Sequence, residues 1–209
     1  MHSGSKSSRL FRQHRHMPKE DDHAWMIAKP RRAIIYILCT GIQWNALQKE
    51  LGACSTVHDR FQDWEKKGFF KALWQLGLAE YDEVQGIEWE WQSVDGAMTK
   101  APFGKDATGP NPTDRAKAGV KRSMLTDGAG IALTVVVDGA NRHDSKLLYA
   151  TLDDIVIVCP EPSEEHPQHL CLDAGYDYPL TRVLVRARGY LDHIRSRGDE
   201  KQKKATIPG

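Results

Sequence analysis

Two aspartates, Asp95 and Asp173, each directly follow a segment that is expected to form a β-strand. Asp95 follows a run that includes Trp91 and Val94, and Asp173 follows 169–172. If folding brings these carboxylates together, their repulsion is relieved by a shared divalent cation, and oxygen-only ligands favour Mg²⁺ or Mn²⁺ over zinc. Two such ions about 4 Å apart clamp the attacking and leaving oxygens of a phosphoryl displacement. The pair therefore predicts phosphodiester cleavage and transfer.

Other aspartates compete for this role. Asp127 and Asp138 are each followed by glycine, which is typical of turn-forming residues. Asp177 is the closer rival, because it lies in the same Asp-Ala-Gly-Tyr-Asp segment as Asp173. We prefer Asp173, since it directly follows the expected strand.

The strands and helices that hold the two aspartates are predicted from the spacing of apolar residues along the chain. An Asp-Gly pair at 127–128 between two β-rich runs predicts a hairpin, and Asp144 is expected to N-cap a helix. The resulting order is β-β-β-α-β-α-β, with the fourth strand parallel to the first and both aspartates at one carboxyl edge. The expected strands are 89–95, 120–126, 131–137, 169–172 and 190–194, and the expected helices are 144–152 and 180–187.

The N-terminal third has helical periodicity instead. A helix from Pro30 is expected to end at Thr40-Gly41, a second to run over 44–51, and a third to be N-capped by Ser55 or Thr56. Three short helices with tight turns are compatible with a helix-turn-helix, although a helical packing or dimerisation module gives the same pattern. The side chains presented to DNA would be Thr56, His58, Asp59, Arg60 and Gln62.

Composition limits the class of protein. The net charge of +1 does not by itself predict a polyanion binder, but bases cluster within 6–19 and again within 182–204. The four cysteines have no CxxC or zinc-ligand spacing. No apolar run approaches the roughly 20 residues that span a bilayer, so we expect a cytoplasmic protein that does not bind a membrane.

Several segments together carry a resemblance to a known family. The stretches 93–102, 119–123, 137–145 and 172–177 resemble transposases of the insertion-sequence four and five superfamily, which are bacterial DDE enzymes. The stretches 41–45 and 55–61 resemble the DNA-binding region that precedes the catalytic core in that family. Each motif is weak by itself, but their order and spacing are specific from about Lys29 onward.

The resemblance implies an α/β fold: an RNase H-like mixed sheet core preceded by a small all-α helix-turn-helix region. It implies a basic, weakly ordered lead-in at 1–28, a DNA-binding region at 29–85 and a catalytic core at 86–209. Asp95 and Asp173 would be the first two acids of a DDE triad that holds two Mg²⁺ or Mn²⁺ ions.

The resemblance also implies the partners. The substrate would be double-stranded DNA, as terminal inverted repeats and target, bound by a homodimer. Thr56, His58, Arg60 and Gln62 would read the terminal repeats, and Lys100, Lys121 and Arg122 would contact phosphates.

The family's third carboxylate is a glutamate on a helix after the last strand. Glu200 is the only glutamate after Asp173, and its polar surroundings have no apolar periodicity to dock a helix. We therefore expect the sequence to stop before the catalytic glutamate and this chain not to transpose DNA by itself. A degraded element and a first reading frame extended by frameshifting both fit this expectation.

Two other functions stay open at this point. A catalytically dead remnant or regulator of transposition would still bind terminal DNA through the helical region. A different RNase H-like nuclease would cut nucleic acid without joining strands. Metal-dependent turnover distinguishes both enzymes from a regulator, and strand-transfer products distinguish a transposase from a nuclease.

Overall fold

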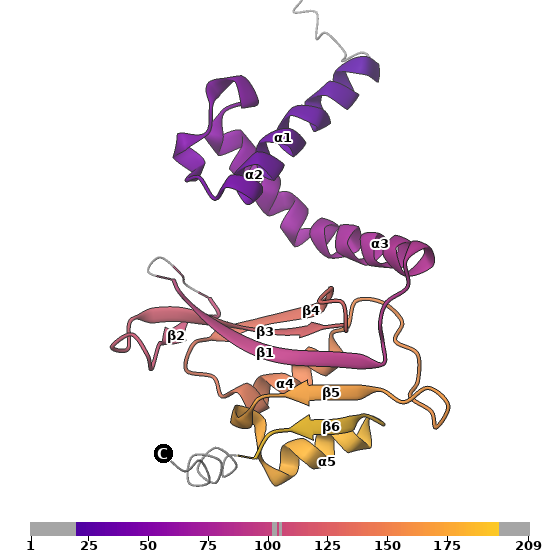
Figure 1. Cartoon of the computed structure of the whole chain (residues 1–209). Coiled ribbons are helices and arrows are strands. Elements are labelled where there is room, and N and C mark those ends of the chain that lie inside the picture. The colour runs from indigo at the N-terminus through magenta and orange to yellow at the C-terminus, as the bar shows by residue number, and fades with distance from the viewer. Residues whose placement is uncertain (1–19, 102–103, 105, 197–209) are drawn as a thin grey trace, which may run out of the picture. The chain divides into compact units, whose positions relative to one another are not determined.

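A computed structural model describes residues 20–101, 104 and 106–196, with side chains from residue 28 onward (Figure 1). Most of the expected lead-in at 1–28, and Glu200, lie outside the described residues or their described side chains. The chain divides into two compact units, Met1–Phe70 and Lys71–Gly209. The domain limits expected at 28 and 85 stay predictions. None of the described helices combines the length and apolarity needed to cross a membrane.

The first unit contains two α-helices joined by two short 3-10 helices. Its elements are α1 (Glu20–Thr40), η1 (Trp44–Ala46), η2 (Lys49–Leu51) and α2 (Cys54–Lys66). Gly41 has a φ of 67°, and this left-handed residue ends α1 as predicted. The start expected at Pro30 is wrong, because α1 begins at Glu20 and Pro30 lies inside it. The single helix expected over 44–51 is wrong, because Leu47 and Gln48 have extended backbone that interrupts it. Ala53, without a side-chain bond, precedes α2, so neither Ser55 nor Thr56 is its cap.

A small apolar core holds these elements together. Ala33, Ile34 and Ile37 of α1 are buried with Leu47 and Val57, and half-buried aromatic rings pack around them. The spacing in α1 is helical, so one face of that helix is buried in this core. The half-buried aromatic residues packed against the core are Tyr36, Trp44, Phe61, Trp64 and Phe70.

The second unit contains a six-stranded mixed sheet in the order β2-β3-β1-β5-β6, with β4 paired to β3 (Figure 1). β1 is antiparallel to β3 and parallel to β5, as predicted, and β3 and β4 form the hairpin expected at 127–128. The two-residue β2 was not predicted. The strands are β1 (Trp91–Lys100), β2 (Gly109–Pro110), β3 (Ala118–Thr126), β4 (Ala132–Gly139), β5 (His169–Leu172) and β6 (Leu191–Ile194).

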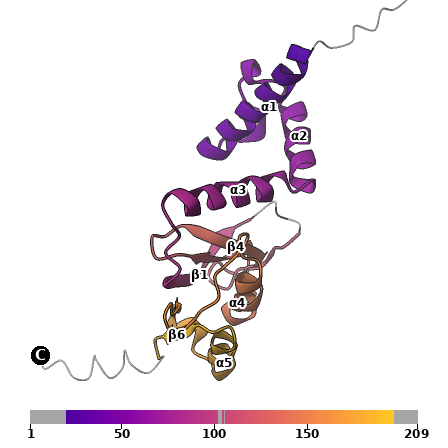
Figure 2. The ribbon, with the colours of Figure 1, turned by 90° about the vertical axis from the view of Figure 1, so that its right-hand side faces the viewer.

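Two helices, α4 (Asp144–Asp153) and α5 (Pro179–Ala187), lie on one side of this sheet (Figures 1 and 2). Their apolar side chains pack against alternate residues of the strands. α4 is capped by His143, whose ring accepts from the backbone N–H of Ser145, so the cap predicted at Asp144 is wrong. The buried residues of this core include Val94, Leu125, Leu148, Leu170, Leu172 and Val185. The remaining helices are α3 (Phe69–Val84) and the 3-10 helix η3 (Ala174–Tyr176).

The expectation that Asp95 ends the first strand is wrong. β1 continues to Lys100, because β3 pairs with it as far as Gly119. The parallel partner β5 ends at Leu172, opposite Val94. Asp95 is therefore the first residue of β1 beyond its pairing with β5.

Candidate active site

Asp95 and Asp173 occupy corresponding positions on neighbouring parallel strands. Val94 and Leu172 are register partners, and each aspartate follows its partner by one residue. Val94 and Leu172 are buried on the face that α4 and α5 cover. Because side chains alternate along a strand, both aspartates belong to the opposite face, where both are exposed. The topology thus places the two carboxylates side by side at the end of β5.

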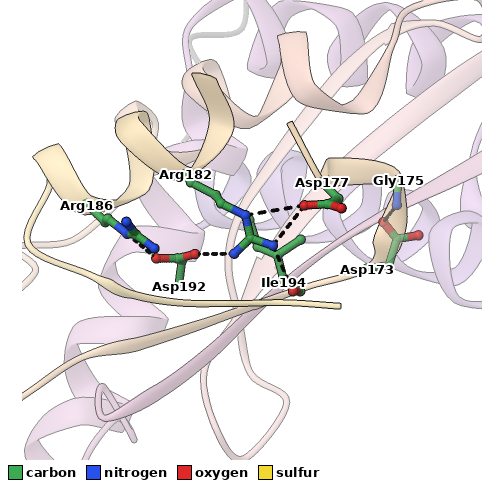
Figure 3. Close-up of polar contacts among 7 residues, drawn as sticks. All are labelled: Asp173, Gly175, Asp177, Arg182, Arg186, Asp192 and Ile194. Atoms are coloured by element: carbon green, nitrogen blue, oxygen red, sulfur yellow. Dashed lines mark hydrogen bonds and ion pairs between the residues drawn. The ribbon is translucent and has the colours of Figure 1, made fainter. Parts of the chain in front are cut away.

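Each carboxylate is held by a backbone amide that follows it in the chain. The Gly96 N–H donates to Oδ1 of Asp95 at 2.8 Å. The Gly175 N–H likewise donates to Oδ1 of Asp173 at 2.8 Å, as Figure 3 shows. Within the described part of the chain, neither aspartate forms an ion pair with a lysine or arginine. Two adjacent negative charges without a paired base are suited to bind a cation.

The donor set fits a hard divalent cation in part. Two carboxylates offer oxygen ligands only, which favours Mg²⁺ or Mn²⁺. Among the described residues, no group of three or more His, Cys, Asp or Glu side chains is placed to hold a metal ion. Asp95 and Asp173 would thus supply only part of a shell of about six ligands.

Asp177, the rival of Asp173, has a different environment. Its Oδ1 accepts from Nη2 of Arg182 at 2.8 Å and from Nε at 3.3 Å (Figure 3). An aspartate already paired with a guanidinium is a poorer cation ligand than one without a base. The contrast favours Asp173.

The other two aspartates have local structural roles. Asp127 accepts the N–H of Ile131 at 2.7 Å and that of Glu88 at 3.1 Å, which confirms it as a turn former. Asp138 lies one residue before the end of β4, accepts the N–H of Gly139 and pairs with Arg142.

A buried hydroxyl lies close to the carboxylates. Tyr176 is 1% exposed, and its hydroxyl lies near that of Ser123 in the covered layer of the domain. Burial, together with the negative charges of Asp144, Asp173 and Asp95, raises the pKa of Tyr176 above its ordinary value. Sequence reasoning gave Asp144 only a capping role and Tyr176 none. No local pattern could have found them, because α4 and η3 reach this region through tertiary packing.

The three bases predicted to contact phosphates lie in different environments. The side chain of Lys121 is 8% exposed, and its Nζ lies 3.0 Å from Oδ1 of Asp144. It faces the covered side of the sheet, which argues against a phosphate contact. Lys100 is exposed and pairs with Asp114 at 3.2 Å, and Arg122 is exposed. Lys100 and Arg122 are therefore accessible, whereas Lys121 is not.

The residues predicted to read DNA lie on two sides of α2. Thr56, Asp59 and Arg60 line the same shallow hollow, in which Arg60 lies 3.9 Å from Asp63. His58 instead packs edge-on against Trp44, with ring centroids 4.9 Å apart. Gln62 is exposed but does not line that hollow. The structure thus brings Thr56 and Arg60 together and separates them from His58.

Two family models match the chain. Residues 91–206 match the model described as "Transposase DDE domain". Residues 10–74 match the model described as "Putative transposase of IS4/5 family". The first match covers the whole sheet with Asp95 and Asp173, and the second covers α1 and α2.

Two curated relatives come from Burkholderia cepacia. The chain is 35% identical over 100 residues to the "Putative transposase for insertion sequence element IS402", covering 47% of each protein. It is 30% identical over 81 residues to the "Insertion element IS402 uncharacterized 16.2 kDa protein", covering 38% of this chain and 55% of that protein. The matches thus span about half the length of these relatives.

Two solved structures of Mos1 overlap distantly. The strand transfer complex has a TM-score of 0.34 and 10% identity, covering 90% of this chain and 62% of that chain. The mariner paired end complex with Mn has a TM-score of 0.37 and 10% identity, covering 89% and 62%. At these TM-scores the likeness carries no argument.

Proposed function

The chain belongs to the family of transposase DDE domains, and from this we propose that it acts as the DNA transposase of an insertion sequence. It binds terminal inverted repeats, and metal-dependent DNA cleavage and strand transfer would need a third carboxylate in addition to Asp95 and Asp173, since the described residues group no third acid with them. The observation that carries the proposal is the placement of Asp95 and Asp173, one residue beyond the partners Val94 and Leu172 on the open face of the sheet. The match to relatives named as insertion-sequence transposases supports it.

In this proposal Asp95 and Asp173 hold Mg²⁺ or Mn²⁺ in a two-metal site. When bound, such ions lower the pKa of the attacking hydroxyl and offset charge on the leaving oxygen. The backbone amides of Gly96 and Gly175 orient the two carboxylates. Because helices α4 and α5 cover only the other face, both carboxylates are accessible to a phosphodiester.

The first unit supplies sequence recognition as a helix-turn-helix. Thr56 and Arg60 reach base edges from their shared side of α2, while His58 and Gln62 support binding from other sides of that helix. Lys100 and Arg122 contact phosphates, and Lys121 is left out because it is buried. A homodimer on DNA stays a prediction, which the mass of the protein–DNA complex tests.

Mn²⁺ titration followed by electron paramagnetic resonance tests the site. Asp95→Asn and Asp173→Asn should each weaken Mn²⁺ binding strongly, because each removes part of an already small ligand set. Asp138→Asn is the matched control, since Asp138 lies in the same sheet but pairs with Arg142. Equal affinity in wild type and Asp95→Asn would overturn the site.

Reaction products distinguish the rival functions. With Mn²⁺ and duplexes that carry the ends of the element, joined strands support the transposase. Cleaved strands that are never joined favour a nuclease. If the chain binds DNA without cleaving it, a fusion that adds a helix carrying a glutamate decides: joined strands then support the transposase, and their absence favours a regulator.

A further inference from the structure

We propose that Arg182 is a positioning residue for Asp173, acting by fastening the loop that follows Asp173 to strand β6. The proposal rests on the proposed function, because it assumes that Asp173 holds the cation. Arg182 does not contact Asp173 (Figure 3). Its effect must therefore pass through the loop.

The guanidinium of Arg182 links three elements. From α5 it donates to Asp177 in the loop, through Nη2 at 2.8 Å and Nε at 3.3 Å. It also donates through Nη1 to Oδ2 of Asp192 at 2.6 Å, and through Nη2 to the Ile194 carbonyl at 3.0 Å (Figure 3). The planar fork of arginine suits such simultaneous contacts, which the single ammonium of lysine cannot reproduce.

The β6 end of this link is firmly anchored. The side chain of Asp192 is 5% exposed and also accepts a hydrogen bond from Nε of Arg186. Burial by itself would raise the pKa of Asp192, but the hydrogen bonds from Arg186 and Arg182 hold it below its ordinary value. A buried carboxylate with two arginine partners is an anion that must stay paired, so it fixes the position of Arg182.

The loop end of the link is short enough to transmit position. Between Asp173 and Asp177 the chain makes a single 3-10 turn, in which the Tyr176 N–H donates to the Asp173 carbonyl at 3.1 Å. The Asp177 N–H donates to the Ala174 carbonyl at 3.3 Å. Holding Asp177 therefore holds the turn in which the Asp173 carboxylate accepts the Gly175 N–H.

This role differs from the one suggested by sequence. Arg182 and Arg186 begin the basic run at 182–204, whose obvious reading is a phosphate-binding or solvated surface. Both guanidiniums instead pair with Asp192 inside the domain. The two arginines differ in one respect: Arg182 also binds Asp177, and Arg186 has no bond to that loop among its described contacts.

That difference supplies a matched pair of variants. Mn²⁺ affinity is measured by electron paramagnetic resonance in the full chain for wild type, Arg182→Gln and Arg186→Gln. Arg182→Gln should weaken Mn²⁺ binding about tenfold, as for other residues that orient a metal ligand, and Arg182→Lys should restore only part of it. Arg186→Gln removes the same kind of bond to Asp192 and should leave Mn²⁺ affinity at the wild-type level.

A second variant covers the case in which Arg182→Gln fails to fold. Asp177→Ala keeps the Arg182–Asp192 pair and removes the link between Arg182 and the loop. It should weaken Mn²⁺ binding, and the double variant should bind Mn²⁺ no more weakly than Arg182→Gln, because both single variants remove the shared Arg182–Asp177 link. Independent, multiplicative losses would overturn the proposal.

Hydrogen exchange in the metal-free protein separates this proposal from the function on which it rests. The Gly175 amide should exchange faster in Asp177→Ala than in wild type, and at the wild-type rate in Arg186→Gln. Unchanged exchange in Asp177→Ala would refute the positioning role whatever the metal data show. Faster exchange with no Asp95-dependent Mn²⁺ binding would support the loop link and reject the metal site.

Discussion

The Nζ of Lys121 on β3 lies 3.0 Å from Oδ1 of Asp144 at the start of α4, on the sheet face opposite Asp95. The side chain of Lys121 is 8% exposed and that of Asp144 is 29% exposed. Breaking a pair that includes so deeply buried a charge is costly, so the pair joins α4 to the strands behind the proposed site.

Removing the lysine charge should destabilise the protein rather than weaken DNA binding. Lys121→Met leaves Asp144 without its base, and we expect the free energy of unfolding to fall by about 1–3 kcal/mol, less than for a fully buried pair because Asp144 is partly exposed. Urea unfolding at pH 7 measures this, with Lys121→Met/Asp144→Asn expected to recover part of the loss. If Lys121→Met were as stable as wild type but bound DNA more weakly, the prediction that Lys121 contacts phosphates would be supported instead.

Gly96 is the site of a close approach beside the same pair. A Cβ at Gly96 would lie 2.4 Å from Oδ1 of Asp144. Gly96→Ala should push this carboxylate away from Lys121 and lower the free energy of unfolding by about 1–2 kcal/mol. Gly77→Ala, in an exposed part of α3 with no atom within 4 Å of the new methyl, should instead raise it by up to about 1 kcal/mol. In thermal unfolding, the melting temperature should fall for Gly96→Ala and rise for Gly77→Ala. An unchanged melting temperature in Gly96→Ala would contradict the close approach of Gly96 to Asp144.

Sequence recognition should depend on Arg60 more than on Gln62. Arg60→Ala should reduce discrimination between terminal-repeat and random duplexes by about 1–3 kcal/mol if the guanidinium reads a base edge. Fluorescence anisotropy at several salt concentrations measures both specificity and the number of phosphates neutralised. Gln62→Ala, on the same helix but outside the hollow that Thr56 and Arg60 share, should reduce DNA affinity with a smaller loss of specificity. Unchanged specificity in Arg60→Ala would indicate that α2 packs within the first unit and does not read the DNA sequence.

Asp192 should make stability depend on acid pH. Its pKa is lowered in the folded protein, although burial opposes this, because Arg186 and Arg182 hydrogen-bond the anion. The stabilisation is complete above the ordinary aspartate pKa of about 3.9 and is lost as pH falls through the lower folded value. Asp192→Asn should therefore unfold about 1–3 kcal/mol more easily at pH 6, with a smaller difference from wild type at pH 3.

Urea unfolding of wild type and Asp192→Asn at several pH values measures how the difference in their free energies of unfolding depends on pH. Asp153→Asn is the control, because its ion pair with Arg188 leaves Asp153 half exposed and contributes little. A difference between wild type and Asp192→Asn that stays constant from pH 6 to pH 3 would contradict the assignment.

The strand order could be predicted from the sequence because it depends on local signals. The run 169–172 alternates apolar leucines with other residues and ends at a polar aspartate, and it forms β5 with the expected limits. The Asp-Gly at 127–128 fixed the β3–β4 hairpin in the same way. Asp95 was expected at a strand end and lies inside β1, because the length of β1 depends on β3, which no pattern around Asp95 reveals.

Side-chain roles were harder to predict than strands. Lys121 and Arg122 look equivalent in the sequence, yet alternation along β3 buries one and exposes the other. Arg182 looked like a surface base, and its bonds to Asp177 and Asp192 depend on how α5 packs beside β6. Such tertiary pairings are absent from any local sequence pattern.

The parallel pairing of β1 with β5 also sets the order in which the site can assemble. The β3–β4 hairpin needs only neighbouring residues, whereas β1 and β5 close a long loop, which is entropically slow. During synthesis at ~5–20 residues per second, Asp173 leaves the ribosome about eighty residues after Asp95, a delay of several seconds. A nascent chain therefore contains Asp95 for several seconds before Asp173 is made. No cation can bind both carboxylates until translation has passed β5.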